Sequence, residues 1–227
     1  MSKPDPLRER GEALARQDAD EPLDVVDDQG RPTGVVKSRR EVHRDGDLHR
    51  AFHLWIVDPE GRVLVQRRSP YKDTGAGKLD VTVGGHLRSG EFWPQALREV
   101  EEELGLPVEV TDLHALGTFR SDRRYGDGTN DRELHETFAM RTSRPLAGFR
   151  PDPREVDVLY AVPCAAAVAL WRDGTPVYAV GRDAHDRPAD ALLHAGDLIE
   201  EGRAETVPAL LALVAWADDE RASGRVD

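Results

Sequence analysis

The chain has 227 residues and carries 43 acidic side chains against 31 Lys and Arg, a formal net charge of −12. This excess of negative charge argues against non-specific binding to a nucleic-acid backbone or to an anionic membrane surface, because both need clustered positive charge. The single cysteine, Cys164, excludes an intrachain disulfide and a Cys-rich zinc site.

No segment approaches the roughly 20 consecutive apolar residues that span a bilayer. The first 22 residues are charged throughout and lack the apolar stretch of a secretory signal. We therefore expect a soluble, cytoplasmic protein. We interpret residues 1–22 as a flexible or helical lead-in, residues 23–185 as the main domain, and residues 186–227 as a C-terminal helical extension packed on the same domain.

From residue 23 onward, short β-like runs alternate with turn residues. The turn sequences Asp28-Gln29-Gly30, Asp58-Pro59-Glu60-Gly61 and Asp173-Gly174 predict three hairpins, each between two such runs. The runs that we expect to form strands are residues 23–26, 34–37, 52–57, 63–66, 79–83, 113–119, 134–140, 168–171 and 177–180.

One helix is expected in the middle of the chain. Leu97, Val100 and Leu104 recur at helical spacing. Pro94 suits the first helical turn and Gly105 suits the end of the helix. Together with the strands, this helix predicts an α/β domain.

A second helix is expected at residues 205–222, near the C-terminus. Its apolar residues form one stripe, which predicts the buried face. This acidic C-terminal segment either covers the sheet or forms the contact of a homodimer. The stripe consists of Val207, Leu210, Leu211, Val214 and Ala215.

The central helix places three carboxylates on one face. Glu99, Glu102 and Glu103 stand at i, i+3 and i+4, where like charges repel unless a divalent hard cation takes their oxygens as ligands. Arg98, four residues before Glu102, is expected to hold Glu102 by an ion pair. Upstream, Gly84-Gly85 end a strand, which allows backbone N–H groups to approach a phosphate beside the metal.

This segment closely resembles the Nudix box, in which Gly, five residues, Glu and seven residues precede Arg-Glu-aliphatic-any-Glu-Glu-any-Gly-aliphatic. There is one departure, because six residues rather than seven separate Glu91 from Arg98. The shortening falls at the junction of loop and helix, so it leaves the metal-binding half intact and the position of Glu91 open. The matching residues are Gly85, Glu91, Arg98, Glu99, Val100, Glu102, Glu103, Gly105 and Leu106.

Further segments between residues 23 and 180 resemble the Nudix branch related to isopentenyl-diphosphate isomerase. These are Asp24 to Gly34, Leu48-His49-Arg50-Ala51-Phe52, Gln66-Arg67-Arg68-Ser69, Lys72 and Leu79-Asp80-Val81-Thr82-Val83-Gly84-Gly85-His86. The resemblance implies a Nudix-type α/β/α sandwich with a mixed sheet. It also implies Mg²⁺- or Mn²⁺-dependent hydrolysis of the diphosphate linkage in a nucleoside diphosphate derivative or another organic diphosphate.

The resemblance also implies roles for individual residues. Glu99, Glu102 and Glu103 would hold the metal, and these three with Arg98 would form the catalytic group. Gly84, Gly85, Arg67, Arg68 and Lys72 would bind the substrate phosphates. The general base stays open between a box glutamate, Glu102 or Glu103, and a glutamate of a later loop, Glu133 or Glu136.

Two further groups have alternative interpretations. His43, His49 and His86 are either structural histidines or, as in the isomerase relatives, ligands of a second metal site. Aromatic residues would either stack on a nucleobase or belong to the core. These are Trp55, Trp93, Phe119 and Tyr125.

Two other functions are to be weighed against hydrolysis. An isomerase of this branch uses a cysteine beside the strand-end histidine, but the sequence Val83-Gly84-Gly85-His86 has no thiol there. Cys164 stands far downstream in an apolar run, as a small buried residue would. A non-catalytic ligand-binding Nudix domain is disfavoured by the intact glutamates. The expected partner is a small-molecule diphosphate, whose attached group the sequence does not identify.

Overall fold

The structure is a computed structural model that describes residues 19–72, 74–199 and 203–223 of the chain. Of the lead-in predicted at residues 1–22, residues 1–18 therefore lie outside the described residues. Among the residues described, no helix is both long enough and apolar enough to cross a bilayer.

The larger of two sheets runs through the whole molecule. Within the described part of the chain it has nine strands, in the order β11-β10-β9-β4-β3-β8-β7, with β5 paired to β4 and β6 paired to β3. The pair β3 and β8 is parallel and its other pairs are antiparallel. The strands are β3 (Leu48–Val57), β4 (Arg62–Arg68), β5 (Leu79–Asp80), β6 (Val83–His86), β7 (His114–Arg124), β8 (Asn130–Arg141), β9 (Val156–Pro163), β10 (Val177–Asp183) and β11 (Ala191–Leu193).

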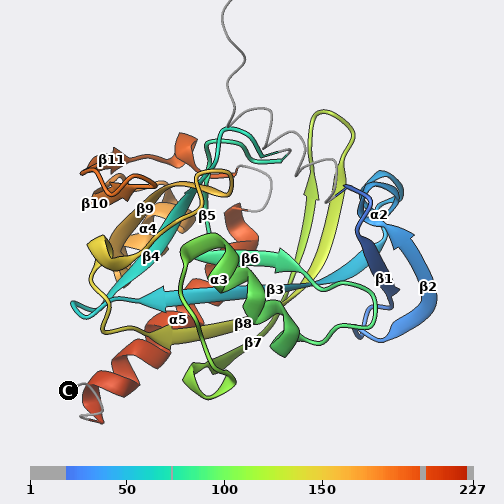
Figure 1. Cartoon of the computed structure of the whole chain (residues 1–227), viewed down its shortest axis with the longest axis horizontal. Coiled ribbons are helices and arrows are strands. Elements are labelled where there is room, and N and C mark those ends of the chain that lie inside the picture. The colour runs from blue at the N-terminus through green and yellow to red at the C-terminus, as the bar shows by residue number, and fades with distance from the viewer. Residues whose placement is uncertain (1–18, 73, 200–202, 224–227) are drawn as a thin grey trace, which may run out of the picture.

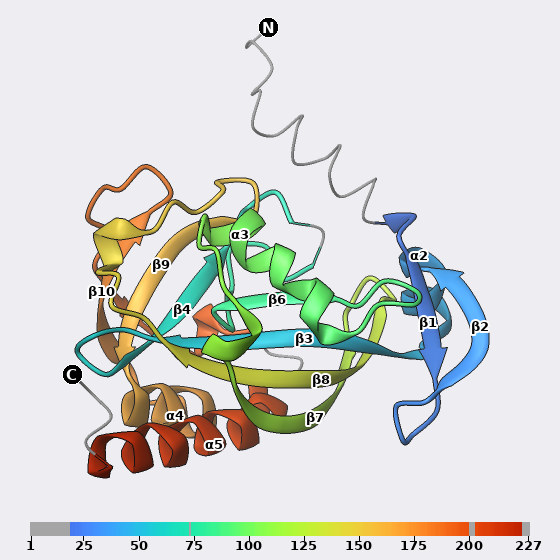
Figure 2. The same cartoon turned by 60° about the horizontal axis from the view of Figure 1, so that its bottom comes forward.

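Helices cover both faces of this sheet. The 3₁₀ helix η1 (Trp93–Leu97) and α3 (Arg98–Leu104) lie on one face, and α4 (Cys164–Asp173) and α5 (Arg203–Ala222) lie on the other (Figures 1 and 2). At one end, β1 (Pro22–Val26) and β2 (Pro32–Ser38) form the small sheet beside α2 (Arg39–Asp45). Short turns form η2 (Val110–Asp112), η3 (Leu146–Gly148) and η4 (Ala195–Asp197). The expected α/β/α sandwich with a mixed sheet is confirmed.

The alternation of side chains along β3 divides the core into two layers. Trp55 and Val57 pack in the cluster with α4 and α5, whereas Leu54 and Ile56 pack with α3 on the other face. Successive side chains of a strand point to opposite faces, and this strand is buried on both. Leu54, Trp55, Ile56 and Val57 are at most 1% exposed.

Two predictions about secondary structure are wrong. Residues 168–171, expected to be a strand of a hairpin, belong to helix α4. A short apolar run does not distinguish a strand from a buried helix, and here the packing against α5 decided for the helix. Residues 79–83 do not form one strand, because the chain bends between β5 and β6 and the Thr82 hydroxyl accepts a hydrogen bond from Ile56 N at 3.1 Å.

The predicted C-terminal helix is present, and its buried face matches the predicted stripe in part, since Val207, Leu210 and Val214 pack against the core. Its buried residues include Leu210 and Leu213, whereas Leu211 is 48% exposed. The face is determined by contacts with α4 and β7, which the periodicity of this alanine-rich segment does not reveal. The segment 186–227 also contributes β11, so it is not wholly helical.

We expect Gly105→Ala to destabilise the protein. Gly105 ends α3 with φ +61°, and an added Cβ would lie 3.2 Å from Arg150 O. A left-handed conformation costs an L residue roughly 1–2 kcal/mol, which urea unfolding would measure. Gly126→Ala is the control, because φ is not positive there and nothing lies within 4 Å of its added Cβ. Equal stability of the two variants would contradict the argument.

Candidate functional site

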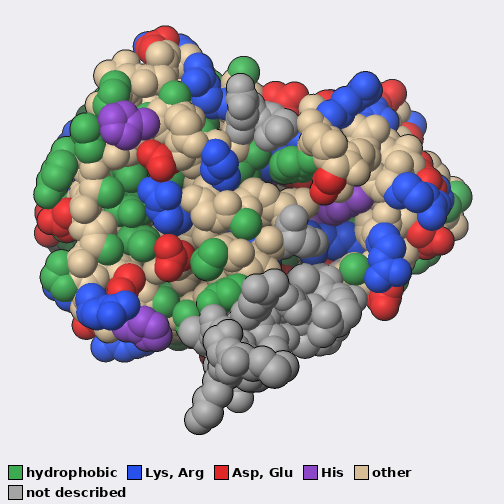
Figure 3. All heavy atoms as spheres, turned by 90° about the horizontal axis from the view of Figure 1, so that it is seen from above, with side chains coloured by type: hydrophobic (Ala, Val, Ile, Leu, Met, Phe, Trp, Pro, Cys, Tyr) green, Lys and Arg blue, Asp and Glu red, His purple; other side chains and the backbone are tan. Residues whose placement is uncertain are grey.

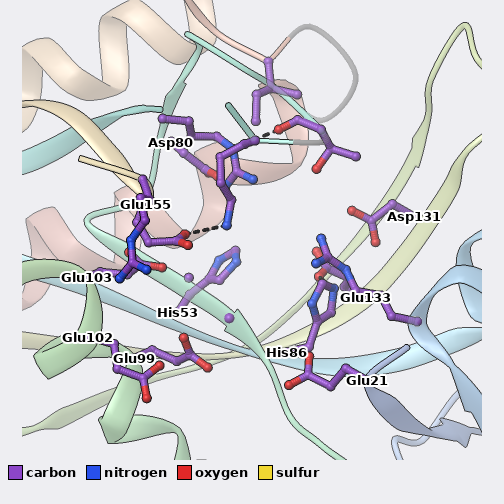
Figure 4. Close-up of a pocket in the computed structure, with 18 of the residues that line it drawn as sticks. Glu21, His53, Asp80, His86, Glu99, Glu102, Glu103, Asp131, Glu133 and Glu155 are labelled. Atoms are coloured by element: carbon purple, nitrogen blue, oxygen red, sulfur yellow. Dashed lines mark hydrogen bonds and ion pairs between the residues drawn. The ribbon is translucent and has the colours of Figure 1, made fainter. Parts of the chain in front are cut away.

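A cavity of about 470 Å³ opens where the glutamates of α3 face the ends of β6, β7 and β8. Seen from above, the surface is hollowed between two parts of the molecule, and a histidine and Lys or Arg side chains are visible in the hollow (Figure 3). In the close-up, Glu99, Glu102 and Glu103 lie on one side and Asp131 and Glu133 on the other (Figure 4). The cavity therefore brings together side chains that are distant in the sequence.

The α3 side is built from the glycine-ended strand and the helix that follows it. Gly85 approaches the helix so closely that an added Cβ would lie 2.8 Å from Glu99 Cγ. The missing residue before Arg98 falls in the tighter 3₁₀ turn η1, after which α3 begins at Arg98. Glu99, Glu102 and Glu103 all line the cavity, as does Gly84. A larger residue at position 85 would therefore displace the Glu99 side chain.

Arg98 does not form the ion pair with Glu102 that we expected from the spacing. Its Nη2 lies 2.9 Å from Glu99 Oε1 and its Nη1 lies 3.4 Å from Glu91 Oε2. The side chain of Glu91 also accepts a hydrogen bond from the backbone of Arg88. In spite of the shortened loop, Glu91 therefore stays within reach of the box arginine.

The three glutamates do not converge as closely as the sequence suggested. Among the residues described, they do not form a group of three donors whose atoms all lie within 4.8 Å of one another. Glu103 is 5% exposed and accepts a hydrogen bond from Gln66 Nε2 at 3.3 Å. Burial raises the pKa of Glu103 well above its usual range, and burial also raises the pKa of Glu99 to about 7. A cation at this site would stabilise the charged form of both.

A cluster of histidines and a carboxylate adjoins the opposite side of the cavity, which two of its members, His86 and Asp131, line. His43 from α2, His49 from β3, His86 from β6 and Asp131 from β8 each offer a donor atom, all within 4.8 Å of one another. The Nε2 atoms of His43 and His49 lie 3.5 and 3.6 Å from Asp131 Oδ1. The three ring centroids are 5.0 to 5.3 Å apart.

The donor atoms of this cluster are prepared for a ligand. His49 Nδ1 lies 3.1 Å from Asp47 O. A hydrogen bond donated by Nδ1 to this oxygen leaves Nε2 unprotonated, with its lone pair facing Asp131. Both His49 Nε2 and Asp131 Oδ1 are buried without a hydrogen-bond partner. Burial lowers the pKa of His86 to about 4, which keeps the ring neutral. These residues therefore fit a transition-metal ion, which neutral imidazoles and a carboxylate bind well.

Glu133 connects this cluster to a second group. Its Oε1 lies 3.1 Å from His86 Nε2 and its Oε2 lies 2.8 Å from His135 Nε2. The ring of His135 stacks on that of His53 at 3.9 Å, and its Nε2 is 3.0 Å from Ser121 Oγ. Although burial opposes the charge of Glu133, the nearby His135 and hydrogen bonds from His135 and His86 hold the pKa of Glu133 well below its usual range.

The predicted basic residues are divided between the faces of the sheet. Arg68 and Lys72 line the cavity, paired with Asp80 and Glu155 respectively. Arg67 is not among the lining residues. Side chains alternate between the two faces along β4, so the Arg67 side chain points to the other face. There the Arg67 guanidinium hydrogen-bonds to Asp197 and stacks over Tyr160.

The other candidate residues are distributed as follows. Glu133 lines the cavity and Glu136 does not. Of the four aromatic residues considered for base stacking, only Tyr125 lines the cavity among the residues described, while Trp55 is buried in the core and Trp93 packs on Phe138.

Sequence reasoning missed several contributors to the cavity, among them Asp131, Arg123 and His53. A signal was present for two of them. Asp131, Glu133 and His135 alternate along β8 and therefore share one face, as Ser121 and Arg123 do along β7. Buried polar residues at every second position of a strand are typical of a functional face.

Comparisons with known proteins agree with this geometry. The family model described as NUDIX domain matches residues 47–180. Nudix hydrolase 3 of Arabidopsis thaliana is 36% identical over 150 residues, 64% of this chain but only 19% of that protein, so the chain spans about a fifth of its length. An isopentenyl-diphosphate Delta-isomerase of Burkholderia multivorans is 38% identical over 138 residues, 60% of this chain and 74% of that protein.

A solved structure from Deinococcus radiodurans shares the fold. It superposes with a TM-score of 0.54 at 23% identity and covers 68% of this chain and 90% of its own.

We expect the histidine cluster to retain a transition metal. Purified protein dialysed without chelator should contain bound Mn²⁺ or Zn²⁺ by elemental analysis, and Asp131→Asn should lose most of it, since the variant removes a charged ligand. His185→Asn, at an exposed position, is the control. Unchanged metal content in Asp131→Asn would show that the cluster does not bind the ion.

Proposed function

Because the chain belongs to the Nudix family, in the branch related to the isopentenyl-diphosphate isomerases, we propose that it is a metal-dependent hydrolase that cleaves the diphosphate linkage of a small organic diphosphate. One observation carries the proposal. The three glutamates of the box line the same cavity as Arg68 and Lys72. Carboxylates that bind cations and cations that bind phosphate are thus combined in a space sized for a small molecule.

The residues of α3 fit the metal that this chemistry requires. Glu99, Glu102 and Glu103 offer only oxygen donors, which Mg²⁺ and Mn²⁺ prefer. When bound, such an ion would neutralise the diphosphate and lower the pKa of a coordinated water. Arg98, through its ion pair with Glu99, acts as a positioning residue for that carboxylate.

The remaining steps belong to the chain's own side chains. Arg68 and Lys72 would bind the phosphate oxygens in exchange for part of their present contact with Asp80 and Glu155. The backbone of Gly84 and Gly85 would let the diphosphate approach the sheet closely. The proton of the attacking water would pass to Glu102 or Glu103 on α3, or to Glu133 across the cavity. Arg67 and Glu136 have no part in this proposal, because neither lines the cavity.

We expect Glu102→Gln to abolish most of the hydrolysis. The substitution keeps the shape of the side chain and removes its charge, so turnover should fall on the order of 100-fold or more. Hydrolysis of a panel of organic diphosphates with Mg²⁺ or Mn²⁺, followed by the phosphomonoester or inorganic phosphate that is produced, would measure it.

Glu101→Gln is the matched control for that experiment. Glu101 is a neighbouring exposed glutamate of α3 that does not line the cavity. Its substitution should leave turnover unchanged. If Glu102→Gln were as active as Glu101→Gln, the proposed metal role of the box would be wrong. A chain that bound diphosphates but neither hydrolysed nor isomerised them would instead be a ligand-binding domain.

Isomerisation of an isopentenyl-type diphosphate is the second candidate, since the histidine cluster and isomerase-named relatives favour it. Two observations place it second. The strand-end stretch Val83-Gly84-Gly85-His86 has no thiol. The lining also has few apolar side chains for an alkyl group, Ile199 and Tyr125 among the residues described.

Cys164 does not replace that missing thiol, and its reactivity tests this. Burial raises the pKa of Cys164, which lies in the α4 layer and not in the cavity. The thiolate that reacts with alkylating agents should therefore form only above the usual pH range of a free cysteine. We expect iodoacetamide to label Cys164 slowly in the native protein and fast in urea. Fast labelling of native protein at neutral pH would contradict this placement.

We propose a small-molecule diphosphate as the partner of this chain, and we propose no nucleic-acid partner. A homodimer stays a prediction as well. Helix α5 packs on α4 and β7, so it covers the sheet, and the exposed apolar side chains nearest the sheet's edge lie on β10 and β11, at Tyr178, Val180 and Leu192. Size-exclusion chromatography with light scattering would determine the oligomeric state.

A further inference from the structure

Six cationic side chains line the cavity among the residues described, and most of them already have a partner. Arg68 pairs with Asp80 and Lys72 with Glu155. Arg88 pairs with Glu21 and Arg154 with Asp152, while Arg39 also takes part in an interaction. The sixth, Arg123, differs from the others.

Arg123 is 7% exposed and forms no hydrogen bond or ion pair with another described residue through its side chain. Its Nε is buried without a partner. The carboxylates of Asp80, Glu133 and Asp131 are near enough to act on its charge, but none of them contacts it directly. Leaving the Nε donor buried without a partner is costly, because it has lost water without a replacement.

The position of Arg123 indicates which end of a bound ligand it would contact. On β7, Arg123 stands opposite Asp131 of β8 in register, so the two side chains share one face of the sheet. Asp131 lies across the cavity from Glu99 and Glu102 (Figure 4). A ligand whose diphosphate is held at α3 therefore reaches Arg123 with its opposite end.

We propose that the group attached to the diphosphate carries a second phosphate, and that Arg123 is the residue that selects it. The inference rests on the proposed function, because it takes the α3 side as the diphosphate end. A guanidinium offers paired donors that match two phosphate oxygens. A phosphate offers the guanidinium three acceptor oxygens and up to two negative charges, against two oxygens and one charge in a carboxylate, while Asp80, Asp131 and Glu133 repel either anion.

Binding constants of matched probes test this proposal. We would titrate the full chain, loaded with Ca²⁺ as an oxygen-binding cation, with inorganic diphosphate, isopentenyl diphosphate and 5-phosphoribosyl 1-diphosphate. The wild-type chain should bind the phosphoribosyl probe at least about tenfold more tightly than the isopentenyl probe, as one charge-assisted contact predicts. In Arg123→Gln this preference should fall to about threefold or less, while the Kd of inorganic diphosphate stays unchanged.

Two control variants accompany the titration. Arg120→Gln removes an exposed arginine of the same strand, which pairs with Asp28, and should keep the preference. Arg123→Lys keeps the charge without the paired donors, so it should retain part of the preference, and it replaces Arg123→Gln if that variant does not fold. Because binding is measured, the result does not depend on whether the chain hydrolyses the bond.

Three results would overturn the proposal. The first is equal binding of both organic probes by the wild-type chain. The second is a preference that Arg123→Gln keeps. The third is an equal loss of affinity for all three probes in Arg123→Gln, which would mean that Arg123 only offsets the nearby carboxylates.

Discussion

The cavity depends on the pairing of one central strand with two neighbours. β3 pairs with β8 in parallel along one edge and with β6 along the other. This register places His49 beside Glu133, and Ala51 between His86 and His135. A shift of one residue in either pairing would turn the polar side chains of that strand to the opposite face. The histidine cluster therefore exists only in this register.

A close contact joins the histidine strands to the helix. β6 carries both His86 and Gly85, and Gly85 touches the side chain of Glu99. One four-residue strand thus sets the distance between the histidine side and the glutamate side of the cavity. If both sides bind cations, as we propose, their spacing is determined by backbone pairing, which is stiffer than a surface loop.

The buried polar groups of the cavity lower the stability of the folded protein. Glu103, Arg123, Asp131 and Glu133 are all less than 9% exposed, and buried charges destabilise a protein unless they are paired. The two layers of apolar side chains on either face of the sheet stabilise the framework around them. Polar burial of this kind, concentrated in one cavity, is expected where ligands and metal ions complete the missing contacts.

The box helix, the early hairpins and the family were predictable from the sequence because each depends on local signals. Turn residues determine hairpins, and the spacing of Glu99, Glu102 and Glu103 determines a shared helix face. The secondary structure of residues 168–171 was not predictable, because a short apolar run is compatible with either a strand or a helix. Packing against α5, which is distant in the sequence, decides that these residues are helical.

The sequence by itself therefore determined the carboxylates of α3 and the glycine turn beside them, on which the proposed binding of a hard cation rests. Only the tertiary structure decided what faces that helix. His86, Asp131 and Arg123 come from three separate strands, and only the folded sheet shows that they line the same cavity. The tertiary structure also distinguishes Arg68 from Arg67, to which the sequence analysis gave the same role. The pleat of β4 directs these neighbouring side chains to opposite faces of the sheet.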